Sequence, residues 1–235
     1  MDKRKSLLSL NCGTTYPFEI GVDEVGRGPL FGRVYAAAVV LPSETTMPPL
    51  FDISLIKDSK KFTSAKKIYK VYEHIKEHAI AYHVSYCDET IVDTINIRRA
   101  THKAMHDAIK HVIHQLNSSV SNTYSTSDYL LCIDGNDFTP YIQFNQHTEF
   151  IEQFPHRCIT SGDNIYAHIA AASILAKVER DAYIEALCIE HPYLDERYSI
   201  ASNKGYGAQK HMDGIRAHGI SQWHRKSFGI CKTYS

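Results

Sequence analysis

The chain has 235 residues with 26 basic and 26 acidic side chains, so its formal net charge is zero, and 43% of its residues are hydrophobic. This length suits one domain with a sizeable core, or one domain with a small appendage. No segment approaches about 18 consecutive apolar residues, which argues against a membrane span, and the neutral charge alone gives no sign of a polyanionic partner. Six scattered cysteines without a CxxC pair argue against a zinc knuckle or a disulfide scaffold and favour the reducing cytoplasm.

The first elements along the chain are predicted to be a leader and two strands. Residues 1–16 contain basic residues and a short apolar patch, but they lack the longer apolar run of a signal peptide, so we expect a flexible leader. Residues 18–25 and 33–41 have the apolar character of strands and are joined by a glycine-rich turn. Because the second run is nearly all apolar, it is expected to be a central strand covered on both faces.

Helices and strands alternate through the next part of the chain. The longest predicted helix, over residues 164–189, has an Ala- and Ser-rich first half that suits close packing against a sheet. Beyond it the sequence changes to short polar stretches, so residues 17–190 are interpreted as an α/β or α+β sheet domain and residues 191–235 as a small, mostly helical C-terminal extension. The remaining predicted elements are helices over 65–78 and 97–115, strands over 79–87 and 129–133, and a polar loop over 117–128.

Three apolar segments end in acidic residues, which are Asp23 and Glu24, Asp134, and Asp163. Acids at strand ends suggest a shared site at one edge of a sheet, although Asp23 and Glu24 converge only if their strand ends or bends there, as the following glycines permit. Clustered carboxylates raise their own pKa values unless a cation sits between them. Mg²⁺ or Mn²⁺ is the natural cation, and two such ions can activate water and stabilise the leaving oxygen in phosphodiester hydrolysis.

Each acid also has a purely structural interpretation. Asp23 and Glu24 could be turn acids that face solvent, and Asp134 could belong to an ordinary Asp-Gly turn. Asp163 could be the N-cap of the long helix. Asp181, inside that helix, is interpreted as a surface or ion-paired residue, but spacing alone does not choose between it and Asp163.

Basic residues are unevenly placed along the chain. Residues 54–76 contain seven lysines against two acids, and residues 204–235 contain six Lys or Arg against one acid. Two such local excesses can form a phosphate-facing surface on a neutral protein. The alternative is that they are two solvated helix faces.

Seven motifs follow one another along roughly residues 17–230. They are GVDEVGRGPLFG (21–32), DSKK (58–61), NIRRATHKAM (96–105), CIDGN (132–136), AAASILAKVERD (170–181), KGYG (204–207) and HGISQWHRKSF (218–228). Any single piece is weak, but the ordered set resembles ribonuclease HII, the type 2 ribonuclease H family. The resemblance implies an α/β ribonuclease H-like fold, a mixed sheet flanked by helices, with a small helical C-terminal extension.

The resemblance implies an endonuclease that hydrolyses the RNA strand of RNA–DNA hybrids and cuts 5′ of single ribonucleotides embedded in duplex DNA. It implies Mg²⁺ or Mn²⁺ as the cofactor, and products with 3′-hydroxyl and 5′-phosphate ends. We expect a cytoplasmic monomer without membrane association, and the C-terminus shows no clear motif for docking a protein partner. The alternatives are another ribonuclease H-like nuclease, such as a transposase, and a non-catalytic hybrid-binding module.

Carried over residue by residue, the family's four acidic metal ligands fall on Asp23, Glu24, Asp134 and Asp163, which favours Asp163 over Asp181. The presence of all four acids argues against a non-catalytic module. The acids would therefore serve both as the catalytic residues and as the metal ligands.

The family's Gly-Arg-Gly element matches Gly26, Arg27 and Gly28, where the backbone would approach the ribose 2′-hydroxyl, the group that distinguishes RNA from DNA. The family's sensing tyrosine matches Tyr206, whose ring would pack on the sugar beside the RNA-to-DNA junction. This pairing argues against a transposase or resolvase-type nuclease, and the Gly-Arg-Gly element separates the chain from ribonuclease HIII. The resemblance also implies phosphate contacts at Lys60, Lys61, Arg225 and Lys226.

The sequence departs from the family pattern at a few positions. Ser161 stands where the family usually has lysine, so a charge that could hold a phosphate or tune Asp163 is missing. His168 stands where the family often has glutamate, which puts a supporting contact in question. The stretch from Asp134 to Asp163 is longer than in many bacterial relatives. Fourteen histidines show no compact zinc spacing, and most are interpreted as surface residues.

Overall fold

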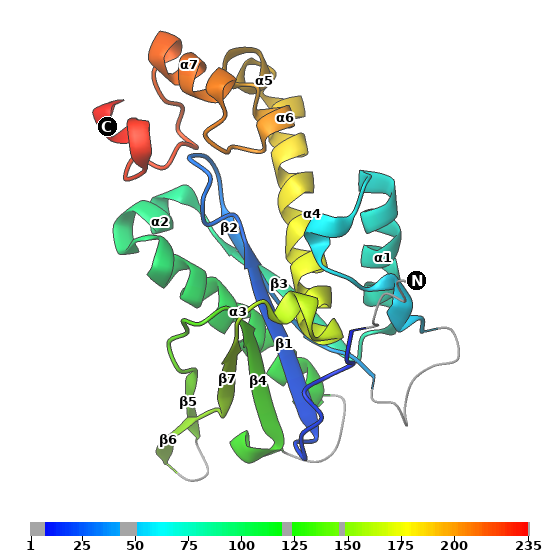
Figure 1. The fold of residues 1–235 in the computed structure, drawn as a ribbon. Helices are drawn as coiled ribbons and strands as arrows, with labels where there is room; N and C mark the ends of the chain where they lie inside the picture. The colour runs from blue at the N-terminus through cyan, green and yellow to red at the C-terminus, as the bar shows by residue number, and fades with distance from the viewer. Residues whose placement is uncertain (1–7, 43–50, 119–123, 146–148, 235) are drawn as a thin grey trace.

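A five-stranded sheet with strand order β3-β2-β1-β4-β7 runs through the middle of the computed structural model, which describes residues 8–42, 51–118, 124–145 and 149–234 (Figure 1). β2 pairs antiparallel with both β1 and β3, whereas β4 pairs parallel with both β1 and β7. The predicted mixed sheet is therefore confirmed. Its strands are β1 (Phe18–Val25), β2 (Val34–Val40), β3 (Ala81–Cys87), β4 (Tyr129–Asp134) and β7 (His156–Ile159).

Helices cover both faces of the sheet (Figure 1). One face packs against α2 (Glu89–Ile95) and α3 (Ile97–Ser118), and the other packs against α1 (Ala65–His78) and α4 (Ala167–Glu190). β2 shows how the sequence produces these layers, because all its residues are buried and they alternate between the two hydrophobic clusters. The prediction that this strand is central and covered on both faces is confirmed.

The start of α4 lies against β1, and a glycine permits this close approach. A Cβ on Gly21 would lie 2.3 Å from the carbonyl carbon of His168 and 2.6 Å from the amide nitrogen of Ile169. Backbone atoms cannot swing aside as a flexible side chain can, so only glycine fits at this crossing. The alanines in the first half of α4 continue the close packing that the sequence predicted.

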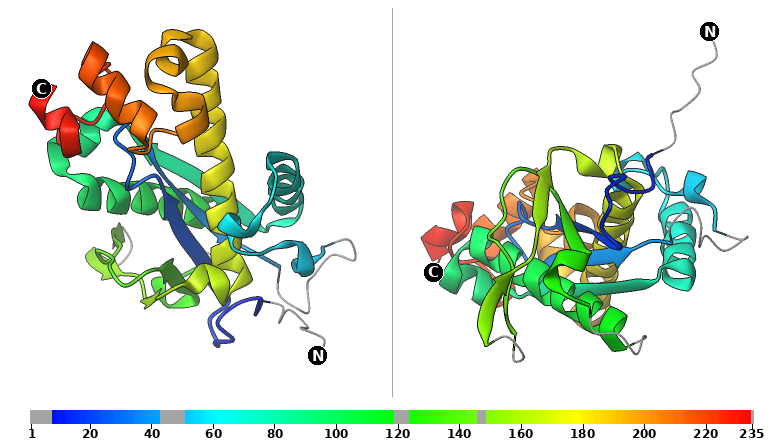
Figure 2. Two further views of the ribbon diagram at one scale, coloured as in Figure 1. Left: turned by 45° about the horizontal axis from the view of Figure 1, so that its top comes forward. Right: turned by 90° about the horizontal axis from the view of Figure 1, so that it is seen from below.

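The chain after α4 forms short helices gathered at one end of the molecule (Figure 2). They share a hydrophobic cluster with the last turns of α4, at Ile184 and Leu187, and with the turn after β1, at Leu30 and Phe31. The predicted helical extension is therefore present, and it packs on the sheet domain through a continuous core. Its elements are α5 (Tyr193–Tyr198), α6 (Ile200–Asn203), α7 (Gln209–His218) and a 3-10 segment (Gly229–Tyr234).

The N-terminal segment differs from its prediction. Of the expected flexible leader, residues 8–16 pack on the domain, since Ser9 forms a bridge with Tyr166 and Leu10 is buried. Two backbone hydrogen bonds hold the bridge, from Ser9 to Ile165 (3.0 Å) and from Ala167 to Ser9 (2.7 Å). Residues 1–7 lie outside the described residues.

The segment between Asp134 and Asp163 contains strands that the sequence did not predict. β5 (Ile142–Asn145) and β6 (Phe150–Gln153) form a separate antiparallel hairpin, and β7 follows it to the edge of the main sheet. Each has four residues, too few for alternation to stand out in the sequence. α2 is likewise a short element that was not predicted. Within the predicted 117–128 loop, α3 extends to Ser118, and residues 119–123 lie outside the described residues.

Membrane insertion finds no support among the helices. None of them, over the described ranges, combines the length and the apolar character that crossing a bilayer requires.

Candidate active site

Asp23 and Asp134 lie side by side on neighbouring parallel strands. Asp23 is in β1 and Asp134 ends β4, one residue beyond the register pair of Val22 with Ile133. Val22 and Ile133 belong to the cluster under α3. Because side chains alternate along a strand, both carboxylates are directed to the opposite face, under α4.

Asp163 is brought to the same edge by a tethered turn. It lies in the 3-10 turn Gly162–Asn164 that follows β7, and the amide of Gly162 donates a hydrogen bond of 2.7 Å to Asp134 Oδ1. A Cβ on Gly162 would lie 3.3 Å from the same oxygen, so the turn is closely fitted to Asp134. The N-cap of α4 is Tyr166, so the alternative interpretation of Asp163 as the helix cap is wrong.

Glu24 joins this group from the next position of β1. The strand continues one residue beyond Glu24, and the bend follows at Gly26, which has a φ of 91°. Oε1 of Glu24 lies 3.3 Å from Nη1 of Arg27, and its charge interacts with those of Asp23 and Asp134. Glu24 therefore links the acids to the turn that follows β1.

Burial and mutual repulsion raise the pKa values of three of these acids. Burial, followed by the charges of Glu24 and Asp134, raises the pKa of Asp23 well above its ordinary value. Burial is also the main reason that the pKa values of Glu24 and Asp134 are raised, and Asp163 adds to the effect on Asp134. Carboxylates in this environment favour either a proton or a nearby cation.

Two lysines stand at the rim of the acid cluster. Lys60 Nζ lies 3.8 Å from Asp163 Oδ2, with a largely exposed side chain. Burial lowers the pKa of Lys60, but the charges of Asp163, Asp58 and the other acids outweigh it and raise the pKa. Lys61 donates a hydrogen bond to Asn164 and pairs with Asp58 at 3.8 Å. Both lysines are thus beside the acids, and a role as phosphate contacts stays a prediction.

The acid cluster is chemically suited to a divalent cation. Its donors are carboxylate oxygens, the hard ligands that Mg²⁺ and Mn²⁺ prefer. Lys60 and Arg27 each bring one positive charge near the cluster, which leaves four acids incompletely neutralised. The residues present therefore fit the ions that the sequence resemblance implies.

Asp181, the alternative to Asp163, occupies a different environment. Its Oδ2 accepts a hydrogen bond of 2.6 Å from Lys177 one turn earlier in α4. The interpretation of Asp181 as an ion-paired residue is confirmed, whereas it is the charge of Asp163 that acts on Asp134.

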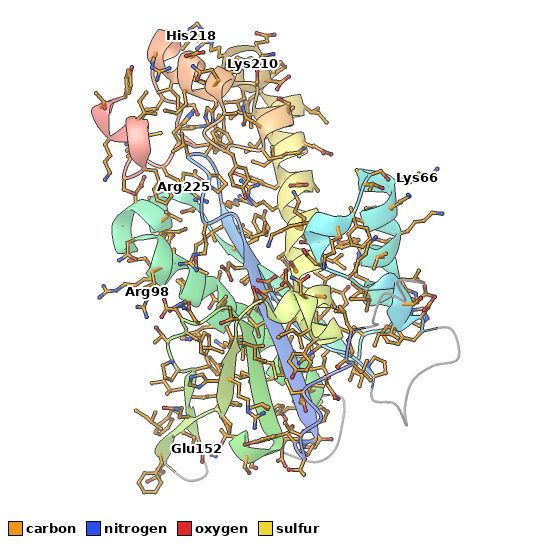
Figure 3. The ribbon with its side chains drawn as sticks, viewed as in Figure 1. Lys66, Arg98, Glu152, Lys210, His218 and Arg225 are labelled. Carbon is orange, nitrogen blue, oxygen red and sulfur yellow. The ribbon has the colours of Figure 1, made fainter. Side chains whose placement is uncertain are left out.

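Arg225 was predicted to contact phosphate, and the structure corrects this prediction. Its side chain has no exposed surface, and it lies beside the turn that follows β1 (Figure 3). The guanidinium donates hydrogen bonds to four backbone carbonyl oxygens, those of Gly26 (2.7 Å), Arg27 (3.1 Å), Pro29 (2.9 Å) and Gly32 (2.8 Å). Arg225 is therefore the residue that shapes the Gly-Arg-Gly turn from within.

Tyr206 lies on the outer side of the same turn. Its side chain is 47% exposed, and its ring edge would be 3.6 Å from a Cβ placed on Gly28. A backbone hydrogen bond of 2.9 Å from Leu30 to Gly205 joins the two loops. The structure thus brings together Tyr206 and the Gly-Arg-Gly turn, which are far apart in the sequence.

Arg180 is a residue at this site that the sequence analysis did not identify. It is fully buried in α4 and lies under Gly26, where an added Cβ would come within 2.5 Å of its Nε. Its Nη2 donates to the carbonyl of Lys204 at 2.8 Å, and its guanidinium is 5.8 Å from the centre of the Tyr206 ring. The signal available in the sequence was its position, since Arg180 lies four residues after Ala176 and four before Ile184, on the buried stripe of the helix.

The interpretation of the histidines as mainly surface residues fails at four positions. His102, His168, His211 and His224 are buried. Nε2 of His211 and Nε2 of His224 are 3.0 Å apart, and burial is the main reason that the pKa of His224 is lowered to about 3. This neutral pair supports the C-terminal helices and contacts no acid of the cluster.

The raised pKa values predict how stability depends on pH without divalent ions. Asp23 contributes stability below its unfolded-state pKa, near 3.8, and this contribution is lost as pH rises through its raised pKa. We therefore expect Asp23→Asn to stabilise the chelated protein increasingly as pH rises above about 4. Urea denaturation at a series of pH values, in the presence of a chelator, measures this difference.

Asp137→Asn is the matched control for this measurement. Asp137 is partly exposed, and its hydrogen bonds with Arg98, at 2.6 Å, lower its pKa. Asp137→Asn should cause a small loss of stability that appears as pH rises, whereas Asp23→Asn should cause a gain of stability over the same rise in pH. A constant effect of Asp23→Asn at every pH would contradict the account of the acid cluster.

Solved structures of other proteins share this fold. The ribonuclease HII in the PCNA:RNase HII complex from Archaeoglobus fulgidus matches with a TM-score of 0.61 and 21% identity, over 91% of this chain and 96% of that one. Ribonuclease H2 from Pyrococcus horikoshii matches with a TM-score of 0.60 and 21% identity, over 92% and 96%. Bst-RNase HIII in complex with Mn²⁺ matches with a TM-score of 0.59 and 19% identity, over 97% of this chain and 70% of that one. The fold is therefore that of the ribonuclease H2 and H3 class.

The sequence comparisons define the family within that class. Residues 20–231 match the family model described as Ribonuclease HII. The ribonuclease HII of Cytophaga hutchinsonii is 40% identical over 89% of this chain and 88% of its own length, and that of Parabacteroides distasonis is 41% identical over 90% of each. The chain belongs to the ribonuclease HII family. It is a ribonuclease H, an enzyme class that acts on nucleic acid and uses divalent metal ions.

Proposed function

We propose that this enzyme hydrolyses the RNA strand of RNA–DNA hybrids and cuts 5′ of single ribonucleotides embedded in duplex DNA. The observation that carries the proposal is the position of the Gly-Arg-Gly turn, which Arg225 holds from within and Tyr206 flanks from without. This turn continues directly from Glu24 of the acid cluster. The turn that would recognise the ribose is therefore adjacent to the acids that would hold the catalytic ions.

The hydrogen bonds of Arg225 orient the amides of the turn. The C=O and the N–H of one planar trans peptide unit point in opposite directions. Because Arg225 binds the carbonyls of Gly26 and Arg27, the N–H groups of Arg27 and Gly28 point away from the protein core. Donors fixed in this way can bind the 2′-oxygen of a ribose, and DNA lacks that oxygen.

The bond that we propose to be cut lies on the 5′ side of the recognised ribose. When the recognised ribose carries the scissile phosphate on its 5′ side, a water oxygen forms a bond to phosphorus while the bond from phosphorus to the preceding 3′-oxygen breaks. The 3′-oxygen leaves as a hydroxyl after receiving a proton, and the ribonucleotide keeps a 5′-phosphate. These are the product ends expected for the family.

The four acids are the residues that would hold the catalytic ions, which we propose to be Mg²⁺ or Mn²⁺. When bound, such ions lower the pKa of water and stabilise charge on the leaving oxygen. Asp23 and Asp163 hold their positions through burial, and Asp134 through the hydrogen bond that it accepts from the Gly162 amide. Lys60 and Lys61 at the rim would bind backbone phosphates and fix the register of the duplex. We also propose a reducing cytoplasm as its compartment, in keeping with the free cysteines.

Tyr206→Ala tests the reading of the ribose. Loss of a ring stacked on the nucleotide weakens binding by about 1–3 kcal/mol, or about 5- to 150-fold. We expect that loss in kcat/KM for duplex DNA with one ribonucleotide, and a smaller loss for a continuous hybrid that offers many sites. The assay is cleavage of end-labelled duplexes with Mg²⁺ and separately with Mn²⁺, beside an all-DNA duplex.

Two variants sharpen this test. Tyr206→Phe retains the ring and should recover most of the activity. Tyr69→Ala removes another exposed tyrosine, on α1, and should leave both substrates unaffected. Equal losses on both substrates for Tyr206→Ala, or a wild-type enzyme that cuts hybrids but not the single ribonucleotide, would overturn the role given to the turn and to Tyr206.

A further inference from the structure

A second cluster of metal-binding side chains lies beside the sheet, apart from the four acids. It consists of Cys12 from the N-terminal segment, Glu19 from β1, Cys132 from β4 and His168 from the first turn of α4. One ligand atom from each of these residues lies within 4.8 Å of all the others. Thiol, imidazole and carboxylate are the three ligand types that zinc binds in proteins.

His168 is the residue in this cluster that most needs a partner. Its side chain is 1% exposed, and neither of its ring nitrogens has a hydrogen-bond partner among the residues that the structure describes. A buried polar group without a hydrogen-bond partner is unfavourable, because it has given up its hydrogen bonds to water. A cation bound to one ring nitrogen would supply a partner for His168. The neighbouring ring of Tyr166 has its centre 5.8 Å from the centre of the His168 ring and meets that ring edge-on.

The distances within the cluster are close to those of a tetrahedral site. The two sulfur atoms of Cys12 and Cys132 are 3.2 Å apart, and Nε2 of His168 is 3.9 Å from Oε2 of Glu19. A tetrahedron with zinc–sulfur bonds of about 2.3 Å and zinc–nitrogen or zinc–oxygen bonds of about 2.0 Å has edges of about 3.3–3.8 Å. Small side-chain rotations would bring all four atoms to that geometry.

Glu19 and the surrounding space are compatible with a bound ion. Glu19 accepts hydrogen bonds from the amides of Cys12 and Thr14 and from the Thr14 hydroxyl, which fixes the carboxylate. An ionised carboxylate has about four lone-pair positions, so one remains for a metal. A cavity of about 180 Å³ is lined in part by Glu19 and His168 and gives an entry path.

This cluster is distinct from the acid cluster although both lie on the same face of the sheet. Glu19 precedes Asp23 by four residues on β1, a distance of about 13 Å along a strand. Cys132 precedes Asp134 by two residues on β4. The two clusters share no residue, and their ligand chemistry differs, because soft thiolates select zinc whereas carboxylates suit Mg²⁺ and Mn²⁺.

We propose that Cys12, Glu19, Cys132 and His168 form a structural zinc site. All four coordination positions are supplied by the protein, as is typical of zinc sites that stabilise a fold rather than catalyse a reaction. The ion joins the N-terminal segment to two strands and to α4, and so adds to the Ser9 bridge that holds residues 8–16 on the domain. It also fixes the start of α4 near the active-site edge of the sheet.

The zinc content of the untagged full-length protein tests the proposal directly. We expect one zinc ion per chain by inductively coupled plasma mass spectrometry after growth in zinc-supplemented medium. Cys132→Ser and His168→Gln should lower the zinc content at least about tenfold. Cys158→Ser removes an exposed cysteine on β7 and should keep one zinc, as should Asp134→Asn.

A second measurement does not depend on the folding of any variant. Co²⁺ added to the metal-free wild-type protein should give the charge-transfer absorption of thiolate ligands and the visible bands of a tetrahedral site, and Zn²⁺ should abolish both. Absence of zinc together with absence of these bands overturns the proposal. So does loss of zinc in Asp134→Asn with retention in Cys132→Ser, since the ion then belongs to the acid cluster.

The redox state of the thiols provides one more outcome. If Cys12 and Cys132 form a disulfide under reducing purification, the mass of the intact chain is lower by two hydrogen atoms, no zinc binds, and the proposal is wrong. None of these readouts requires nuclease activity. The zinc site and the proposed ribonucleotide cleavage can therefore fail independently of each other.

Discussion

Asp134→Asn is expected to reduce kcat for hybrid and single-ribonucleotide cleavage by at least about 10²- to 10³-fold. Asp134 interacts electrostatically with each of the other three acids. Besides burial, its charge raises the pKa values of Asp23 and Glu24, and the charge of Asp163 raises the pKa of Asp134. Asparagine has nearly the same shape, so the hydrogen bond from the Gly162 amide can remain while the charge is lost. The change therefore removes ion-binding capacity with little effect on the fold.

The same assay decides between the two candidates for the fourth acid. Asp163→Asn should reduce kcat as severely as Asp134→Asn. Asp181→Asn should leave kcat within about twofold of wild type, because Asp181 is paired with Lys177 in α4. A partly exposed ion pair of this kind contributes at most about 1 kcal/mol to stability. KM should change little in the first two variants if the turn and the lysines bind the duplex. Loss of activity in Asp181→Asn with survival of Asp163→Asn would reverse the assignment.

The fold was predictable wherever the local sequence pattern matched the local structure. The predicted bounds of β1 and α1 coincide with the observed ones, because β1 lies between clear breaks and the side chain of Ser64 caps α1 by accepting from the amide of Lys67. The start of α4 was placed three residues early, because residues 164–166 contain no Pro or Gly that would mark the boundary between the 3-10 turn and the helix. Tertiary contacts of that turn with Asp134, which the sequence does not display, decide its conformation.

The roles of residues that depend on distant partners were the least predictable. Arg225 stands in a basic segment, and nothing nearby in the sequence shows that carbonyl oxygens some two hundred residues away surround it. The cluster of Cys12 with Cys132 likewise joins sulfur atoms 120 positions apart, so a search for compact zinc spacing could not detect it. The four acids were found because each ends a recognisable apolar segment and because the ordered motifs resemble one family.

Arg225→Ala is expected to lower the free energy of unfolding by about 3–5 kcal/mol, because it removes a buried cation from four carbonyl oxygens that then lack a donor. Burial and the nearby charge of Arg180 lower the pKa of Arg225 to about 10, so the side chain is still charged at neutral pH and all its donors are available. Arg225→Lys keeps the charge but not the planar fork, and it should recover only part of the loss. Urea denaturation monitored by circular dichroism measures both variants.

Arg216→Ala is the control for stability, since Arg216 is an exposed residue paired with Asp213 and its removal should change the free energy of unfolding by less than about 0.5 kcal/mol.

The salt dependence of KM then separates a structural role from a phosphate contact. Removing one phosphate contact lowers the slope of log KM against log salt concentration by about 1. We expect that change for Lys60→Ala and not for Arg225→Ala. Arg225→Lys, which keeps the charge, should instead lose discrimination between ribose and deoxyribose as the turn relaxes. A changed salt slope with unaltered stability in Arg225→Ala would return Arg225 to the nucleic-acid surface.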